Sequence, residues 1–251
     1  MFNDEQLERY SRQLMVEEFD LAGQEALAAA RVLVVGCGGL ASPAALYLAG
    51  AGVGQLVLAD DDRVELSNLH RQVAFRGGQV NLPKAEALRD QLHTLNPDVD
   101  VRAAVVRVDD HWLDKEVAGA TLVLDCTDNF ATRQAINRAC VSHRVPLVSG
   151  AAVRMDGQLA VFDLRQPDSP CYACVYGEGT EGDLACSQAG IAGPVVGTVG
   201  ALQALAAMRT LTGASVASVL HLFDGRTLGW RQVRLRRDAQ CPVCGAGQES
   251  G

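Results

Sequence analysis

Two pairs of cysteines carry the clearest chemistry in the sequence. Cys171 and Cys174 form one Cys-x-x-Cys knuckle, and Cys241 and Cys244 form another. Four thiolates suit tetrahedral Zn²⁺, with Zn–S bonds of about 2.3 Å, and such a set leaves no open coordination position. The spacing therefore predicts a structural zinc site that joins the end of the chain to its middle. A redox dithiol is the alternative, and it needs only one of the two pairs.

A glycine-rich turn offers a second kind of site. Gly36 and Gly38 follow the apolar run at 31–35 and precede a helical segment that Pro43 opens. Small residues let the backbone approach a phosphate or a ribose, and the start of the helix adds N–H groups and a positive dipole end. Asp60 ends the next apolar run, where its carboxylate can accept hydrogen bonds from ribose hydroxyls. The pattern predicts a nucleotide site.

The cations that follow Asp60 favour a triphosphate over a nicotinamide dinucleotide. Arg71 lies in the polar segment 60–72, and Lys84 comes shortly after it. A triphosphate carries several negative charges, which Arg and Lys can match, and Arg is suited to forked phosphate contacts. Taken singly, either cation fits a solvated surface better than a phosphate site, and it is the glycine turn before them that favours the phosphate role. A nicotinamide-dependent oxidoreductase and a non-enzymatic zinc-ribbon adaptor are the alternatives from other classes.

A third acidic motif, Asp125-Cys126-Thr127-Asp128-Asn129, follows another apolar run. Open α/β sheets bind ligands at the carboxyl ends of their strands, and a carboxylate there can hold Mg²⁺ against phosphates. We assign this role to Asp128. The same side chain can also cap the helix expected from Phe130.

Alternating strands and helices must position these residues. The apolar runs predict strands at 31–35, 55–60, 99–108, 121–125 and 146–150, and helices at 44–49, 84–95 and 130–144. A further helical pattern covers the first 30 residues. Alternation of this kind predicts a doubly wound, mostly parallel α/β sheet of the Rossmann type.

The second half of the chain differs in character. Antiparallel strands are expected at 158–164 and 219–235, and a long Ala-rich helix at 193–211. No linker separates the halves, so we expect one domain. Its parts would be N-terminal helices at 1–30, a nucleotide-binding half at 31–150, a zinc-bearing half at 151–245 and a tail at 246–251.

Composition excludes several classes of protein. The 251 residues are 48% apolar and 21% charged, the balance of a globular protein. The net charge of 22 − 30 = −8 argues against a dedicated nucleic-acid or anionic-membrane binder. No apolar run reaches the roughly 18 residues of a membrane span, and the acidic N-terminus is unlike a signal peptide. We therefore expect a cytoplasmic protein whose eight cysteines are thiols or metal ligands.

These motifs occur together in one order along the chain. They are Arg9–Gln13, Gly36–Leu40, Ser67–Gln72, Lys84, Asp128–Asn129 and the two cysteine pairs. Together they resemble the MoeB/ThiF family of sulfur-carrier adenylyltransferases, relatives of the ubiquitin-activating enzymes. The likeness spans Glu8 to Gly245. One departure is Ala41, where the family usually has Gly, and Ala is tolerated at that position.

The resemblance implies adenylation of the C-terminal glycine of a small ubiquitin-like carrier protein, with ATP as substrate and Mg²⁺ at Asp128. The residues that it assigns to the nucleotide are Gly36, Gly38, Gly39, Asp60, Ser67, Asn68, Leu69, His70, Arg71, Lys84, Asp128 and Asn129. Arg12 in that family reaches the triphosphate of the neighbouring subunit, which makes the active unit a homodimer. The half at 151–245 would bind the carrier.

Two carriers fit the sequence. The sequence and length of the segment 170–224 resemble the branch that acts on the small subunit of molybdopterin synthase, which we favour. The segment 192–197 also fits the branch that acts on the thiazole sulfur carrier. No rhodanese-like extension follows Gly245, so we expect a separate sulfur donor. Cys186, in a polar Gly-rich loop, is a candidate for a covalent link with the carrier, and an idle thiol is the alternative.

Overall fold

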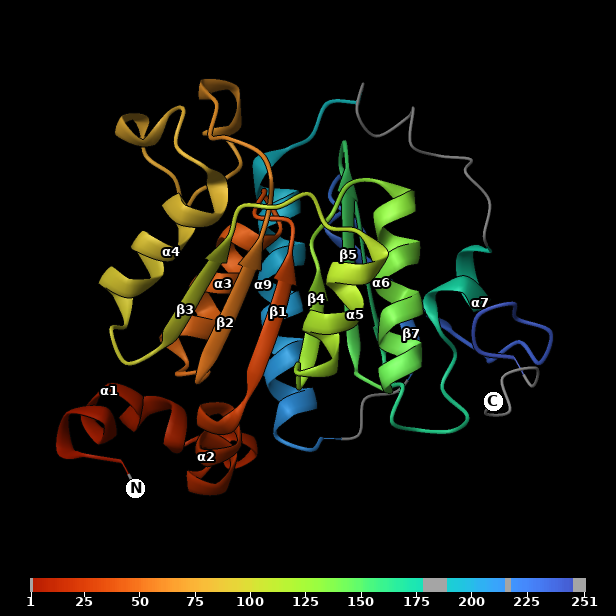
Figure 1. Ribbon diagram of the computed structural model, residues 1–251, viewed down its shortest axis with the longest axis horizontal. Coiled ribbons are helices and arrows are strands. Elements are labelled where there is room, and N and C mark those ends of the chain that lie inside the picture. The colour runs from red at the N-terminus through yellow and green to blue at the C-terminus, as the bar shows by residue number, and fades with distance from the viewer. Residues whose placement is uncertain (1, 178–188, 215–217, 246–251) are drawn as a thin grey trace.

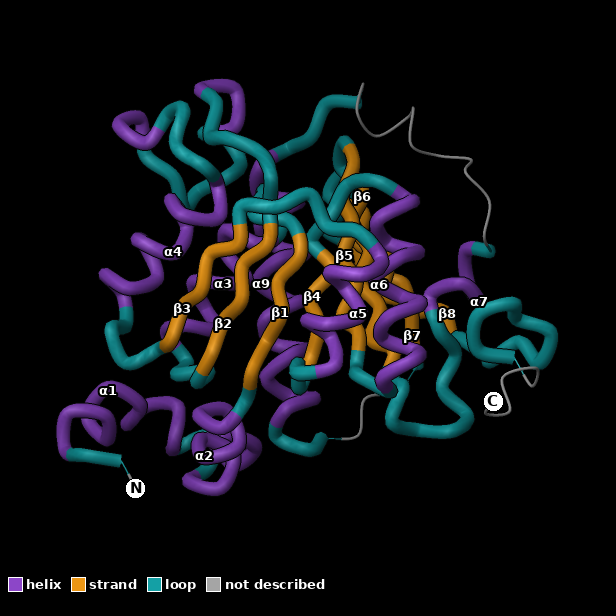
Figure 2. The backbone as a smooth tube through the Cα atoms, in the orientation of Figure 1, coloured by secondary structure: helices purple, strands orange, loops and turns teal. Residues whose placement is uncertain are grey.

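The computed structural model describes residues 2–177, 189–214 and 218–245. Within these residues one eight-stranded sheet has the order β3-β2-β1-β4-β5-β6-β7-β8 (Figure 2). The strands are β1 (Arg31–Val35), β2 (Gln55–Ala59), β3 (Asp100–Ala104), β4 (Leu122–Asp125), β5 (Leu147–Val153), β6 (Asp156–Phe162), β7 (Val219–Asp224) and β8 (Gly229–Arg234). The first five strands pair in parallel, and β5 to β8 pair antiparallel. The predicted fold class is confirmed.

Helices cover both faces of this sheet (Figure 1). One face carries α3 (Ala41–Gly50), α4 (Lys84–Leu95) and α9 (Gly193–Leu211), and the other carries α5 (Asp110–Ala118) and α6 (Phe130–His143). The helices α1 (Asp4–Leu14) and α2 (Leu21–Ala29) lie near the edge where the parallel strands begin. The short elements are η1 (Glu17–Phe19), η2 (Leu66–Asn68), η3 (Gly77–Gln79) and α7 (Tyr172–Tyr176).

The central strands are buried on both faces, as their continuous apolar runs predict. On β1, Val32 and Val34 pack into the core shared with α3 and α9, whereas Leu33 and Val35 pack into the core shared with α5 and α6. Successive side chains of a strand point to opposite faces, so one apolar run supplies both cores.

Two expectations about the elements are corrected. The strand expected at 99–108 ends at Ala104 because β3 is an edge strand and its partner β2 ends at Ala59, which pairs with Ala104. The helix α5 was not expected. It begins at an Asp109 cap, whose carboxylate accepts a hydrogen bond from the Trp112 N–H at 2.7 Å, and it buries Leu113 and Val117.

The connections create a switch point in the sheet. From β1 the chain passes through α3 to β2 on one side, and from β3 it returns through α5 to β4 on the other side of β1. Crevices at such points, outside the carboxyl ends of the strands, are where open α/β sheets bind ligands. In the described ranges, no helix combines the length and the apolar character needed to cross a membrane.

Candidate active site

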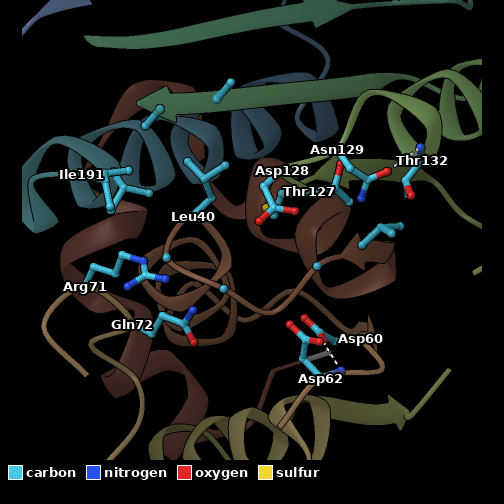
Figure 3. A pocket seen from close by; sticks show the side chains of 18 of the residues that line it. Leu40, Asp60, Asp62, Arg71, Gln72, Thr127, Asp128, Asn129, Thr132 and Ile191 are labelled. Atoms are coloured by element: carbon cyan, nitrogen blue, oxygen red, sulfur yellow. Dashed lines mark hydrogen bonds between the residues drawn. The ribbon is translucent and has the colours of Figure 1, made fainter. Parts of the chain in front are cut away.

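A cavity of about 900 Å³ opens at the carboxyl edge of the sheet, at the switch point between β1 and β4. Its volume lies in the range typical of ligand sites. It brings together most of the residues assigned to a nucleotide: Gly36, Gly38, Gly39, Asp60, Asn68, His70, Arg71, Lys84, Asp128 and Asn129. Figure 3 shows Arg71 and Gln72 on one side of the cavity, Asp60 and Asp62 on another, and Asp128 and Asn129 on a third. Ser67 and Leu69 are not among the described residues that line it.

The glycine turn connects β1 to α3 and lines this cavity. Gly36 has a φ of 85°, and a Cβ added there would lie 2.8 Å from the Cys126 carbonyl oxygen. Both observations require glycine, because other residues rarely adopt this φ and the space is taken. No side chain caps the N-terminus of α3, and Gly38, Gly39 and Leu40 before it line the cavity. The positive end of the helix is therefore available to an anion.

Asp60 is held in place by the turn that it faces. Its Oδ2 accepts a hydrogen bond from the Cys37 N–H at 2.6 Å, and its Oδ1 accepts one from the Asp62 N–H at 2.7 Å. Burial raises the pKa of the Asp60 carboxyl above its ordinary 3.8, although these two N–H groups and nearby Lys84 act in the opposite direction. Each oxygen keeps a second lone pair, so the fixed carboxylate can still accept hydrogen bonds from ribose hydroxyls.

The two cations of the site differ in their partners. Lys84, the first residue of α4, is buried, and its Nζ lies 2.7 Å from the Asp62 Oδ2. Arg71 donates a hydrogen bond to the Ser67 carbonyl at 3.1 Å and contacts the His70 Nε2 at 2.9 Å. Among the described residues Arg71 has no carboxylate partner. Its charge is therefore available to a bound anion.

Asp128, in the segment after β4, was expected to bind Mg²⁺ and was also a candidate for the cap of α6. Asn129, not Asp128, caps α6, because its Oδ1 accepts the Thr132 N–H at 2.9 Å. The Asp128 side chain is exposed to the cavity and makes no hydrogen bond or ion pair with the described residues. A free carboxylate that points into a cavity also lined by Arg71 and Lys84 fits a divalent cation, which takes carboxylate oxygens as ligands.

Arg12 and Cys186 are the remaining predicted site residues. Arg12 is an exposed residue of α1, does not line the cavity, and belongs to a helix that lies near the edge where the parallel strands begin (Figure 1). Cys186 lies outside the described residues. The cavity is also lined by residues of β5, β6 and the neighbouring chain that were not assigned from the sequence, among them Ala151, Ala152, Gly157, Gln158 and Ile191.

Further cavity residues were also missed. Asp62, Gln72, Arg107, Thr127, Thr132 and Arg133 line the cavity. The Asp60–Asp62 run was a signal for Asp62. Arg107 lies in the segment expected to be strand, which instead leaves the sheet after Ala104 and borders the cavity. No local pattern distinguishes Arg133 from the other charged residues of its helix.

The four paired cysteines form a separate cluster between α7 and the chain end. Their Sγ atoms lie within 4.8 Å of one another, with Cys171–Cys241 at 3.6 Å and Cys174–Cys244 at 3.4 Å. Four sulfurs at tetrahedral Zn–S bond lengths are about 3.8 Å apart. Asn137 donates its Nδ2–H to the Cys171 Sγ at 3.5 Å. The donor set and its spacing fit a closed tetrahedral metal site, and both pairs contribute, unlike in a redox dithiol.

Comparison with known proteins identifies the family. The ThiF family profile matches residues 10–243. The chain belongs to the ThiF family. The resemblance stated from the motifs is therefore confirmed, and the cavity lies within the part of the chain that the ThiF profile covers.

Two curated ThiF-like relatives match along nearly their whole length. The sulfur carrier protein ThiS adenylyltransferase of Escherichia coli (strain K12) is 49% identical over 245 residues, which are 97% of this chain and 97% of that protein. The molybdopterin-synthase adenylyltransferase of Salmonella typhimurium is 44% identical over 245 residues, 97% of this chain and 98% of that protein.

Solved structures share the fold. The crystal structure of E. coli MccB with ATP superposes with a TM-score of 0.83 at 24% identity, over 94% of this chain and 73% of that chain.

Proposed function

We propose that this chain is an adenylyltransferase that activates the C-terminal carboxylate of a small ubiquitin-like sulfur-carrier protein with ATP. The proposal rests on one observation: the same cavity is lined by the glycine turn, the Asp60 carboxylate, Arg71, Lys84 and the free Asp128. The names of the relatives, which are adenylyltransferases acting on ThiS or on molybdopterin synthase, agree with it.

The two ends of the cavity suit the two substrates. The end formed by Gly36–Leu40, Asp60, Arg71 and Lys84 offers the charges and N–H groups that a nucleotide needs. The end beside β5 and β6 is lined by small residues such as Ala151, Ala152 and Gly157, which leave room for an extended glycine-rich tail. The tail carboxylate then meets the α-phosphate between these ends.

The reaction joins two anions and requires no general base. A carboxylate oxygen of the carrier attacks the α-phosphorus of ATP, the bond from that phosphorus to the β-phosphate oxygen breaks, and acyl-adenylate and pyrophosphate form. The carboxylate is already ionised at neutral pH. Bringing two unit charges to 4 Å costs about 4 kcal/mol at an effective dielectric constant of 20. Arg71 and Lys84 offset this repulsion and stabilise the charge that develops on pyrophosphate.

Asp128 is the residue that we assign to Mg²⁺. The Asp60–Asp62 group also brings carboxylate oxygens together, within 4.8 Å of one another. We favour Asp128 because Asp60 already accepts two N–H groups and Asp62 is paired with Lys84, whereas the Asp128 carboxylate makes no such contact with the described residues. When bound, the cation neutralises phosphate charge and polarises the phosphoryl oxygens.

The four cysteines are proposed to hold Zn²⁺. The sulfur spacing and the closed donor set support a structural ion.

Arg12 is proposed to act in a homodimer. The helix α1 lies near the edge where the parallel strands begin, whereas the cavity lies at their carboxyl edge, and this separation supports a role for Arg12 in the cavity of the partner subunit (Figure 1). Sulfur transfer to the activated carrier is assigned to a separate donor.

The test is carrier-dependent exchange of labelled pyrophosphate into ATP. The proposal predicts exchange with an intact carrier, none with a carrier that lacks its terminal glycines, and an AMP adduct on the intact carrier by mass spectrometry. The small subunit of molybdopterin synthase and the thiazole sulfur carrier are both compatible with the relatives, so both are assayed in parallel. Absence of exchange and adduct with both carriers would refute the proposal. Because the step needs no thiol, Cys186→Ser should retain exchange.

A further inference from the structure

The segment that carries Asp128 is fixed by Arg133, a residue outside the sequence assignments. Arg133 lies on the first turns of α6, and only 11% of its side chain is exposed. Its Nη2 donates to the Thr127 carbonyl at 2.5 Å and to the Gly150 carbonyl at 3.4 Å. One side chain thus ties the end of β4 to β5 directly beside the cavity.

The charge of Arg133 is matched by Asp125 rather than by the cavity. The Arg133 Nε lies 3.9 Å from the Asp125 Oδ2, and the Asp125 side chain is 1% exposed. Burial works against the guanidinium charge, but Asp125 favours it, and the pKa of Arg133 stands above its usual range. A buried ion pair is favoured when additional hydrogen bonds satisfy the lone pairs of its carboxylate. Here the Asp125 carboxylate also accepts the Thr127 Oγ1–H at 2.6 Å and the Ser149 Oγ–H at 2.7 Å.

The opposite face of the sheet supports the same segment. Gln203 of α9 is fully buried, and its Nε2–H donates to the Asp125 carbonyl at 2.8 Å. A Cβ added at Gly150 would lie 2.4 Å from the Gln203 side-chain amide, so a larger residue there would displace Gln203 from its contacts. The segment is held from α6 on one face and from α9 on the other.

These contacts leave one side chain free. The residues at 125, 127 and 129 are fixed by Asp125 with Arg133, by the Thr127 hydrogen bonds and by the Asn129 cap. Asp128 lies between them and makes no hydrogen bond or ion pair within the described chain. The carboxylate is therefore presented to the cavity from a backbone that hydrogen bonds hold in place, and hydrogen bonds behind a metal ligand orient it in this way.

We propose that Arg133 is a positioning residue that places the Asp128 carboxylate for its cation, and that it does not bind the triphosphate. The proposal rests on the function proposed above. Arg133 directs its hydrogen bonds to two backbone carbonyls and has a carboxylate partner, whereas Arg71 has none among the described residues. Losing such an outer contact commonly lowers metal affinity or activity 10- to 100-fold, roughly.

The experiment compares Arg133→Met and Arg133→Lys with a control on the same helix. Arg138→Met removes a cation of α6 that is 45% exposed and pairs with Asp110 at 2.9 Å, away from the cavity. We expect the Mg²⁺ concentration for half-maximal exchange to rise about 10- to 100-fold in Arg133→Met, less in Arg133→Lys and not in Arg138→Met. At saturating Mg²⁺ the KM for ATP should stay at the wild-type value.

Hydrogen–deuterium exchange of residues 126–129, without nucleotide, gives a second readout that needs no activity. The Arg133 variants should exchange these amides faster than wild type and Arg138→Met. Should Arg133→Met lose its fold, Arg133→Lys carries the test because it keeps a charge beside Asp125. An unchanged Mg²⁺ response with unchanged amide exchange would overturn the proposal, and so would a raised KM for ATP at saturating Mg²⁺. If the wild-type chain shows no exchange with either carrier, the proposed function fails, while the amide result still tests the positioning.

Discussion

The Lys84 ammonium lies 2.7 Å from the Asp62 carboxylate, and the two side chains differ sharply in exposure, at 8% and 68%. The buried cation thus depends on a partner that faces solvent and the cavity. In the absence of nucleotide, Asp62 supplies the negative charge that Lys84 needs. In the proposed function, a bound nucleotide phosphate adds further negative charge beside Lys84.

This pairing predicts the behaviour of Asp62→Asn. The substitution leaves the Lys84 charge without its counter-ion and should destabilise the free protein by about 1 kcal/mol, because solvent screens the exposed partner. For a chain of this size, that lowers Tm by about 2–4 °C. MgATP should raise Tm more in Asp62→Asn than in wild type. Asp61→Asn is the control, since Asp61 is exposed and no ion pair is formed by it within the described residues. Equal melting behaviour of the two variants would contradict the role of Asp62.

The cysteine cluster predicts one zinc ion per chain. Cys241→Ser should remove zinc from the purified protein and lower Tm, because the cluster joins α7 to the segment near the chain end. Cys140→Ala serves as the control, since Cys140 is buried in the core beside α5 and is no member of the cluster. Metal content is measured by mass spectrometry. Full zinc in Cys241→Ser would show that the four sulfurs do not form the site.

Asp60 predicts a pH dependence of stability. Its pKa is raised in the folded chain, so the folded state binds this proton more tightly than the unfolded state. The stability that the group contributes is present at low pH and is lost as the pH rises through the folded pKa. The unfolding free energy of wild type minus that of Asp60→Asn should therefore fall as the pH rises from the ordinary value of 3.8, then level off. Urea titrations across the acidic range measure it, and a rising difference would contradict the burial of Asp60.

Arg12 predicts complementation between subunits. Arg12→Ala and Asp128→Ala should each abolish exchange when assayed alone. Random remixing of the two variants makes about half of the dimers mixed. Each mixed dimer has one cavity with both an intact Asp128 and an intact Arg12 from its partner, so about one quarter of wild-type activity should return. Failure to restore any activity, with mixed dimers demonstrated by mass spectrometry, would show that the cavity uses its own Arg12 or none.

The sequence was most informative where local pattern and long-range structure agree. The strand at 31–35 and the helices at 84–95 and 193–211 have the predicted bounds, because their apolar periodicity, flanking Gly and Pro and final burial all favour the same element. The cavity residues Gly36, Asp60, Lys84 and Asp128 follow strands or begin helices, so the fold gathers them at one edge.

What could not be predicted depends on contacts between distant segments. The end of β3 is set by its partner β2, and the role of Arg133 is set by the Gly150 carbonyl on another strand. The choice of Asn129 over Asp128 as the cap of α6 depends on side-chain geometry that two adjacent capping residues do not reveal.

The central claim is that the Asp128 carboxylate holds the Mg²⁺ needed to transfer the adenylyl group from ATP to the carrier. Carrier-dependent exchange of labelled pyrophosphate into ATP, measured in Asp128→Ala with its zinc content and Tm checked against wild type, tests it most directly. The account predicts loss of exchange by a factor of about 100 or more, with zinc and Tm retained. Exchange at the wild-type rate in Asp128→Ala would contradict it.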